Sequence, residues 1–225
     1  MNQKAGAIIA AGGSSRRMGE IDKLFAPLGG RPVLAHVLDA FQNCEPVDRI
    51  VLVVNRDNLT KAEELVAENS FSKVSDVVAG GERRQDSVAA GLAKLTGCDW
   101  VIVHDGARPF VTPELIEHGL EAARESGAAI AAIPVKDTIK LANTDDFVLG
   151  TPPRANLWQV QTPQVFRYDI LAAAYRNLDE DVTDDAALVE KAGFKVKLYM
   201  GDEINLKITT RVDLSLAEVL INYVK

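Results

Sequence analysis

Three cations that follow a glycine- and serine-rich segment are the first residues whose types and spacing could do chemistry. Arg16, Arg17 and Lys23 come after Gly12-Gly13-Ser14-Ser15, in a chain whose formal net charge is −7. Small residues let backbone N–H groups approach a phosphate closely, and Arg or Lys neutralises the charge on its oxygens. The segment predicts a polyanion site, with a solvated connecting loop as the ordinary alternative.

The segment matches neither of the two common phosphate loops. A dinucleotide-binding fingerprint reads GxGxxG, and the run from Gly12 to Arg17 has no third glycine. A Walker A loop ends in Gly-Lys-Ser or Gly-Lys-Thr, and that ending is missing here. We therefore expect a different phosphate loop, which presents Arg17 and Lys23 as side-chain clamps.

A second glycine turn, Gly80-Gly81-Glu82-Arg83-Arg84-Gln85-Asp86-Ser87, opens a helical pattern. In structural terms it is a tight strand-to-helix connection with Asp86 or Ser87 as the N-cap. In functional terms, the Gly81 N–H and the Ser87 hydroxyl are groups that could hydrogen-bond the edge of a base. This signal is weak by itself.

Asp105 and Arg108, in His104-Asp105-Gly106-Ala107-Arg108-Pro109, follow a third apolar run. An acidic residue at the carboxyl end of a strand, opposite a phosphate loop, is well placed to hold Mg²⁺ or another divalent cation. Arg108 would hold a second anionic group, and the alternative is an Asp105–Arg108 ion pair that braces the turn. Lys207 stands among apolar residues, so its ammonium should point at a specific partner. We expect no catalytic role for His104.

Short apolar runs alternate with amphipathic stretches, and this alternation predicts the elements that position these residues. The runs 7–11, 49–54, 73–78, 100–104 and 128–134 are typical of strands buried on both faces. The helices expected between them are 32–42, 58–68, 86–95 and 113–125. The repetition predicts a Rossmann-like α/β fold, with a mostly parallel sheet and helices on both faces. Ligands bind such sheets beyond the carboxyl ends of the strands, where the loops 12–23, 80–87 and 105–109 would meet.

The alternation breaks between about residues 136 and 158. Thr138–Leu141 and Phe147–Leu149 flank the polar cluster Asn143-Thr144-Asp145-Asp146, which is typical of a hairpin. An isolated two-stranded arm is marginally stable in water, so we expect this one to pack on a second subunit and form a homodimer. Beyond it we expect helices at 167–177, 184–191 and 212–223 and a strand at 195–199.

Length and composition limit the remaining possibilities. The 225 residues suit one domain, 1–225, that carries the arm. A pI near 5.1 argues against broad nucleic-acid binding, and no apolar run is long enough to span a membrane. Cys44 and Cys98 lack CxxC spacing, and Met1–Lys4 leads straight into the first strand without a signal peptide. We therefore expect a cytoplasmic protein.

In sequence order, these motifs resemble those of the 2-C-methyl-D-erythritol 4-phosphate cytidylyltransferases of the non-mevalonate isoprenoid pathway. AIIAAGGSSRRMG…K resembles the family's AAGxGxRMG…K, GGERRQDSVAAGL its GGxxRxxSVxxGL, and HDGARPF its HDxARPF. PVKDTIK, LWQVQTPQVF, VTDDAALVE and NLKITTRVDL also match. The resemblance covers nearly the whole chain. The ribitol-5-phosphate cytidylyltransferases share most of these motifs and are the alternative.

The resemblance implies a role for each matched position. Arg17, Lys23 and Lys207 match catalytic cations, although an extra loop residue leaves Arg16 as the alternative to Arg17. The nucleotide-binding positions are Ala11, Gly12, Gly13, Gly81, Glu82, Ser87 and Asp105, and Asp105 is also the metal position. The positions for the polyol phosphate are Asp105, Arg108, Thr138, Arg154, Thr162 and Thr183. Members of the family are dimers whose arm lends residues to the neighbouring site.

The implied reaction joins CTP and 2-C-methyl-D-erythritol 4-phosphate and releases pyrophosphate. A phosphate monoester is already a nucleophile, which fits a site rich in Lys and Arg without a catalytic dyad. Two alternatives remain: the same chemistry on ribitol 5-phosphate or another sugar phosphate, and a nucleotide-binding module that has lost catalysis.

Overall fold

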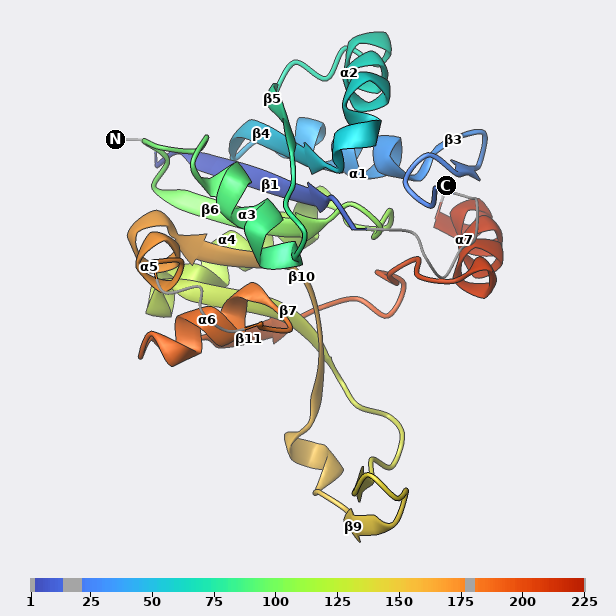
Figure 1. Cartoon of the computed structure of the whole chain (residues 1–225), viewed down its shortest axis with the longest axis vertical. Helices are drawn as coiled ribbons and strands as arrows, with labels where there is room; N and C mark the ends of the chain where they lie inside the picture. Colours follow the sequence, from blue (N-terminus) through green and yellow to red (C-terminus); the bar gives the residue numbers. More distant parts are fainter. Residues whose placement is uncertain (1–2, 14–21, 177–180, 225) are drawn as a thin grey trace.

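A seven-stranded sheet forms the centre of the molecule, and its strands run in the order β11-β7-β10-β6-β1-β4-β5 (Figure 1). The computed structural model describes residues 3–13, 22–176 and 181–224. The strands are β1 (Ala5–Ala11), β4 (Val47–Val54), β5 (Val74–Ala79), β6 (Trp100–Asp105), β7 (Ala128–Pro134), β10 (Trp158–Arg167) and β11 (Lys197–Met200). The neighbours β6, β1, β4 and β5 are parallel, as are β7 and β11, whereas β10 runs antiparallel to both β6 and β7. The expected mostly parallel sheet is confirmed.

Helices cover both faces of the sheet because successive residues of its central strand point to opposite sides. In β1, Ile9 packs in the core formed with α1 (Val33–Asn43), α2 (Leu59–Glu68) and α4 (Pro113–Ser126). Ile8 packs in the opposite core, formed with α3 (Arg84–Leu92), α5 (Tyr168–Ala174) and α6 (Asp185–Lys191). Burial on both faces explains why these strands are continuous apolar runs.

The last helix, α7 (Arg211–Val224), lies apart from both layers. Its Ala217 and Ile221 pack with Leu28 of the short hairpin β2 (Pro27–Leu28) and β3 (Arg31–Pro32), and with Ile208. This third cluster fixes the segment that carries Lys207. Within the described residues, no helix combines the length and the apolar character needed to cross a membrane.

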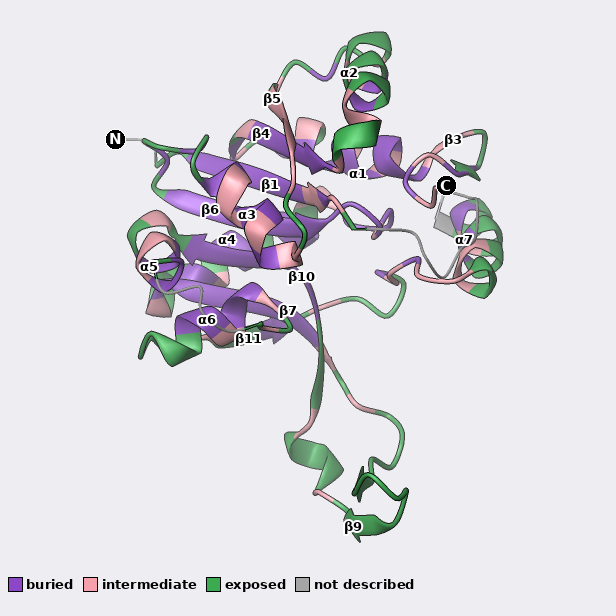
Figure 2. Cartoon of the chain, in the orientation of Figure 1, coloured by how far each residue is buried: buried purple, intermediate pink, exposed green. Residues whose placement is uncertain are grey.

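The expected hairpin is present and projects away from the sheet (Figure 1). Its strands are β8 (Leu141–Ala142) and β9 (Val148–Gly150), and the Asn143 Oδ1 accepts hydrogen bonds from two backbone N–H groups in the turn. The arm is almost entirely exposed, in contrast to the buried strands of the sheet (Figure 2). Its exposed apolar side chains include Phe147, Val148 and Leu149.

The strand β10 was not predicted from the sequence. Its pattern hides a strand because Gln161, Thr162 and Gln164 are polar yet buried, and Pro163 lacks an N–H. The pairing of β10 with β7 shifts register between Val160 and Gln164, where the proline lies. The chain tolerates the proline there because the ladder is already interrupted.

The start of α3 was also predicted wrongly. The helix begins at Arg84 and its N-cap is Arg83, so neither Asp86 nor Ser87 is the cap. Asp86 lies in the first turn and accepts a hydrogen bond from the Arg83 backbone N–H at 3.1 Å. The earlier start places Arg84 at the carboxyl edge of the sheet, where β6 ends.

Candidate active site

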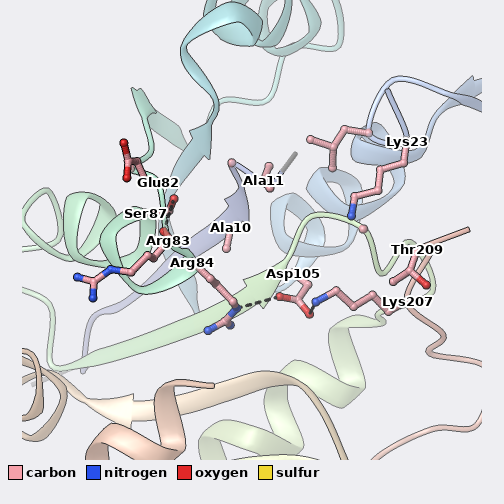
Figure 3. Close-up of a pocket in the computed structure, with 15 residues that line it drawn as sticks. Ala10, Ala11, Lys23, Glu82, Arg83, Arg84, Ser87, Asp105, Lys207 and Thr209 are labelled. Atoms are coloured by element: carbon pink, nitrogen blue, oxygen red, sulfur yellow. Dashed lines mark hydrogen bonds and ion pairs between the residues drawn. The ribbon is translucent and has the colours of Figure 1, made fainter. Parts of the chain in front are cut away.

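A cavity of about 330 Å³ opens at the carboxyl ends of β1 and β6, between the turn that starts α3 and the segment before α7 (Figure 3). It is lined by Ala10, Ala11, Gly12, Gly13, Lys23, Leu24, Gly81, Glu82, Arg83, Arg84, Ser87, Asp105, Ala107, Lys207 and Thr209. Four segments far apart in the sequence meet here because parallel strands end at one edge of the sheet.

The cavity brings together Lys23 and Lys207, two of the three cations expected to be catalytic. Lys207 lies beside Asp105, and Lys23 points into the same cavity (Figure 3). Every residue expected to bind nucleotide lines the same cavity, namely Ala11, Gly12, Gly13, Gly81, Glu82, Ser87 and Asp105. Arg17 and its alternative Arg16 lie outside the described residues.

A side chain would crowd Ser87 where the segments that follow β1 and β5 meet α3. A Cβ on Gly80 would lie 2.4 Å from the Ser87 Oγ, and a Cβ on Gly12 would lie 2.9 Å from the same atom. Both distances are shorter than van der Waals contact. The buried Ser87 side chain therefore occupies space that only glycines leave, and its hydroxyl donates to the Arg83 carbonyl at 3.3 Å.

Three cations surround the buried Asp105 carboxylate. The Lys207 Nζ lies 2.8 Å and the Arg108 Nε 3.4 Å from Oδ2, while the Arg84 Nε lies 3.3 Å from Oδ1. Burial would raise the pKa of Asp105, but the charges of Lys207, Arg84 and Arg108 outweigh it and hold that pKa well below its usual range. Asp105 is therefore ionised at neutral pH. The ion pair with Arg108, considered above as an alternative, is present within this larger network.

His104 lies in a buried, hydrogen-bonded environment. It is fully buried, and burial lowers its pKa to about 3, so the ring is neutral at physiological pH. Its Nε2 lies 3.2 Å from the Arg108 carbonyl oxygen, and its Nδ1 lies 3.0 Å from the Thr162 Oγ1. A proton on Nε2 satisfies both contacts, because the Thr162 hydroxyl then donates to Nδ1 and accepts from the Asp105 N–H at 3.1 Å.

Several contacts hold the segment that carries Lys207. The Asn205 side chain donates to the Thr162 carbonyl at 2.8 Å, and the Asn205 carbonyl accepts from the Arg108 Nη1 at 2.7 Å. The backbone N–H of the buried Ile208 donates to the Ala107 carbonyl at 2.8 Å. Lys207 is thereby fixed beside the loop that follows β6.

A second cavity, of about 290 Å³, adjoins the first and shares Arg84, Asp105 and Lys207 with it. Among the expected polyol-phosphate residues, Arg108, Thr162 and Thr183 line it together with Asp105. Thr138 and Arg154 do not join them. Within the described residues, Thr138 and Arg154 are both exposed on the arm and line neither of these two cavities.

Several residues that support this site were given no role on the basis of the sequence. Arg84 lines both cavities, and it also bonds the buried Asp185 at 2.7 Å. The sequence did contain a signal for Arg84, since Arg84 is the arginine of the matched GGxxRxxSV segment. Asp213 accepts from the Thr210 N–H while the Thr210 Oγ1 accepts from the Asp213 N–H, which is a capping box readable as Thr-x-x-Asp.

The donor chemistry at Asp105 fits a divalent cation that takes most of its ligands from phosphate. Asp105 supplies one ionised carboxylate, and within the described ranges no group of three His, Cys, Asp or Glu side chains could hold a metal ion. Mg²⁺ commonly binds one or two carboxylates together with substrate phosphates and water. A single carboxylate at the edge of a cation-lined cavity is compatible with that pattern.

Comparisons with known proteins agree with this geometry. The model of the 2-C-methyl-D-erythritol 4-phosphate cytidylyltransferase family matches residues 5–223. The protein of that name from Dehalococcoides mccartyi is 53% identical over 221 residues, which are 98% of this chain and 97% of that protein. The one from Alkaliphilus oremlandii is 42% identical over 224 residues, 97% of this chain and 95% of that protein. The crystal structure of 4-diphosphocytidyl-2C-methyl-D-erythritol synthase from Anaerococcus prevotii superposes with a TM-score of 0.87 at 33% identity, covering 98% and 97% of the two chains.

The Rossmann-like sheet and the cation-lined cavity at its carboxyl edge are those of a nucleotidyltransferase. The matches extend over nearly the whole chain and leave no large segment outside them. The chain belongs to the 2-C-methyl-D-erythritol 4-phosphate cytidylyltransferase family.

Proposed function

We propose that this chain transfers the cytidylyl group of CTP to 2-C-methyl-D-erythritol 4-phosphate, a step in isoprenoid precursor synthesis by the non-mevalonate pathway. A phosphate oxygen of the acceptor attacks the α-phosphorus of CTP in line and forms a new P–O bond. The bond from the α-phosphorus to the bridging oxygen breaks, and pyrophosphate leaves with its electron pair. The observation that carries the proposal is the meeting of Lys23, Lys207 and Asp105 in one cavity.

The cations stabilise charge rather than transfer protons. A phosphate monoester needs no strong base to attack, so catalysis consists of positioning and of electrostatic stabilisation of the phosphoryl oxygens. Lys23 and Lys207, with Arg17 from the loop, would neutralise the triphosphate and the transition state. The small residues Ala11, Gly12, Gly13 and Gly81, with Glu82 and Ser87, would receive the nucleotide, as their shared cavity supports.

The second cavity would receive the acceptor phosphate. Arg108, Thr162 and Thr183 supply a cation and two hydroxyl groups there, beside Asp105. A divalent cation such as Mg²⁺, when bound, would withdraw negative charge from the phosphates, with Asp105 as its protein ligand. Asp105 would also orient Lys207 between the two substrates, because it contacts the Lys207 ammonium and lines both cavities.

The arm would complete the site of a second copy. Thr138 and Arg154 lie on the arm and outside both cavities of their own chain, and the arm exposes Phe147 and Leu149 to 71% and 70%. A hairpin of this kind gains stability by packing on another surface. We therefore propose a homodimer of single-domain chains (residues 1–225) in which each arm brings Thr138 and Arg154 to its partner's site. The buried free thiols Cys44 and Cys98 support a cytoplasmic location.

Pyrophosphate release tests the reaction. The protein is incubated with CTP and Mg²⁺, and with either 2-C-methyl-D-erythritol 4-phosphate or ribitol 5-phosphate. We expect release with the first acceptor. Lys207→Ala should lower the rate by about 10²–10³-fold, the effect of losing one charge-stabilising group. Lys94→Ala is the matched control, because Lys94 pairs with Asp76 away from the cavity. Release with ribitol 5-phosphate alone would overturn the proposed acceptor, and an unchanged rate in Lys207→Ala would overturn its role.

Sedimentation tests the dimer. Phe147→Ser should shift the protein toward monomer and raise the KM for the acceptor, because Thr138 and Arg154 would leave the partner's site. Val212→Ser is the control, since Val212 is an equally exposed apolar residue on α7, at 77%. A monomeric wild-type protein with full activity would refute the role given to the arm.

A further inference from the structure

A buried carboxylate behind the site holds one of its arginines. Asp185 is the first residue of α6 and has no exposed surface. One of its oxygens accepts from the Arg84 Nη1 at 2.7 Å, and the other accepts from the hydroxyl of Tyr175, which follows α5. Both oxygens therefore have partners, which is the condition for burying a charge without a large penalty.

Arg84 spans the distance between this carboxylate and the active-site carboxylate. Its Nη1 contacts Asp185 while its Nε lies 3.3 Å from the Asp105 Oδ1, and Lys207 lies on the other side of Asp105 (Figure 3). Arg84 is also a residue that both cavities share. Burial opposes the charge of Arg84, but Asp185 and Asp105 outweigh it and raise the pKa of the guanidinium above its usual value. The cation is therefore permanent.

Asp185 is not needed to begin its helix. The N-cap of α6 is the preceding residue, Asp184, whose Oδ1 accepts from the Ala187 N–H at 3.0 Å. Asp184 also accepts from the Gln164 side chain on β10 at 2.9 Å, which ties the helix start to the sheet. The Asp185 carboxylate takes no part in this cap and contacts Arg84 and Tyr175 instead. The position of Asp185 is explained by its ion pair with Arg84.

We propose that Asp185, fixed by Tyr175, is a positioning residue that holds Arg84 against Asp105. The inference rests on the proposed function. Lys207 and Arg108 share the Asp105 Oδ2. Under the proposed function, both would turn toward phosphate oxygens when substrates bind. Arg84 cannot follow them, because its second contact is a buried carboxylate. It therefore keeps Asp105 in its orientation throughout the reaction.

The requirement is for arginine at this position. A guanidinium presents several donors in a fixed plane and can bond two carboxylates at once, whereas an ammonium is a single charged point on a flexible stem. Arg84→Lys keeps the charge and loses the bridge. Asp185→Asn keeps the shape and loses the charge that anchors it, and Tyr175→Phe removes one hydrogen bond from Asp185.

Kinetics and a spectroscopic signature test the proposal together. Pyrophosphate release is measured at a temperature well below the unfolding transition for wild type, Asp185→Asn, Arg84→Lys and the double variant. We expect kcat to fall about 10–100-fold in each single variant, the usual effect of losing a group that orients an active-site ligand, with the KM for CTP within about threefold of wild type. The double variant should be no worse than the worse single one, because the two residues act as a unit. Tyr175→Phe should show a smaller loss in the same direction.

The matched control is Asp181→Asn. Asp181 pairs with Arg83, the neighbour of Arg84, but it is 80% exposed and lines neither cavity. We expect wild-type kinetics from it. If Asp185 only held α6 in place, its substitution would lower Tm while kcat of the folded protein stayed at the wild-type value, and that result would overturn the proposal.

The spectroscopic measurement needs no turnover. In the substrate-free wild-type protein, the Nε–H signal of Arg84 in a ¹⁵N NMR spectrum should exchange slowly with water, and Asp185→Asn should make that exchange at least tenfold faster. Unchanged exchange would overturn the anchoring. A wild-type protein that releases no pyrophosphate would refute the proposed function, and the NMR comparison would still decide whether Asp185 anchors Arg84.

Discussion

The contact between Gly12 and Ser87 gives a prediction whose size follows from the structure. A Cβ at Gly12 would meet the Ser87 Oγ at 2.9 Å, while the next atoms, the Ser87 Cβ and the Gly80 Cα, lie at 3.7 and 3.8 Å. Gly12→Ala therefore clashes with one oxygen atom. Overpacking of this kind costs about 1.5 kcal/mol. Because the backbone at Gly12 does not have a positive φ, the alanine also restricts the unfolded chain, which returns about 0.5 kcal/mol.

The expected net loss is about 1 kcal/mol in the free energy of unfolding, or about 2–4 °C in Tm for a chain of this size. In a Ser87→Ala background the oxygen is gone, so Gly12→Ala should be neutral or slightly stabilising. The double-mutant cycle should show a coupling of about 1.5 kcal/mol, measured by urea unfolding. Gly13→Ala is the matched control, because no atom of the described residues lies within 4 Å of its added Cβ. Equal costs of Gly12→Ala in both backgrounds would refute the reasoning.

Three further predictions concern the supports of the site. Asp213→Ala should cost about 1–2 kcal/mol in urea unfolding at pH 7, because it removes the capping box of α7. Burial would raise the pKa of Asp213, but bonds from Thr209 and Thr210 hold it below its usual value. The cost should therefore persist above about pH 4 and shrink as the pH falls to 3, and a cost independent of pH would contradict this. Burial raises the pKa of Cys44 to about 11, so a thiol reagent at pH 8 should label Cys44 only after unfolding. The contribution of the buried thiol to stability should fade as the pH rises from about 9 toward 11. Rapid labelling of Cys44 in the native protein would contradict this prediction. Ile208→Ala should cost about 2–5 kcal/mol, because Ile208 is fully buried beside Lys207, and a cost below 1 kcal/mol would show that the third cluster does not hold this segment.

The predictable part of the fold was the part whose chemistry is local in the chain. β1, β4 and β6 are runs of Val, Ile and Ala because both of their faces are buried, so their composition alone indicates a central parallel sheet. β10 escaped prediction because its buried glutamines and Thr162 find partners only in the folded protein. The Gln164 side chain, for example, bonds Asp184 from another element.

The sequence by itself determined the class of site. Glycines and cations that follow apolar runs indicate a phosphate site at the carboxyl edge of a sheet, because parallel strands all end there. The family motifs then named the reaction. Only the tertiary structure decided which charges meet. Arg84 and Asp185 are separated by 101 positions in the chain, yet the Arg84 Nη1 lies 2.7 Å from the Asp185 Oδ2. Pairings between such distant residues follow from how the helices pack on the sheet, and no local pattern encodes them. The same holds for Thr138 and Arg154, which the fold places on the arm and outside the two cavities that share Asp105.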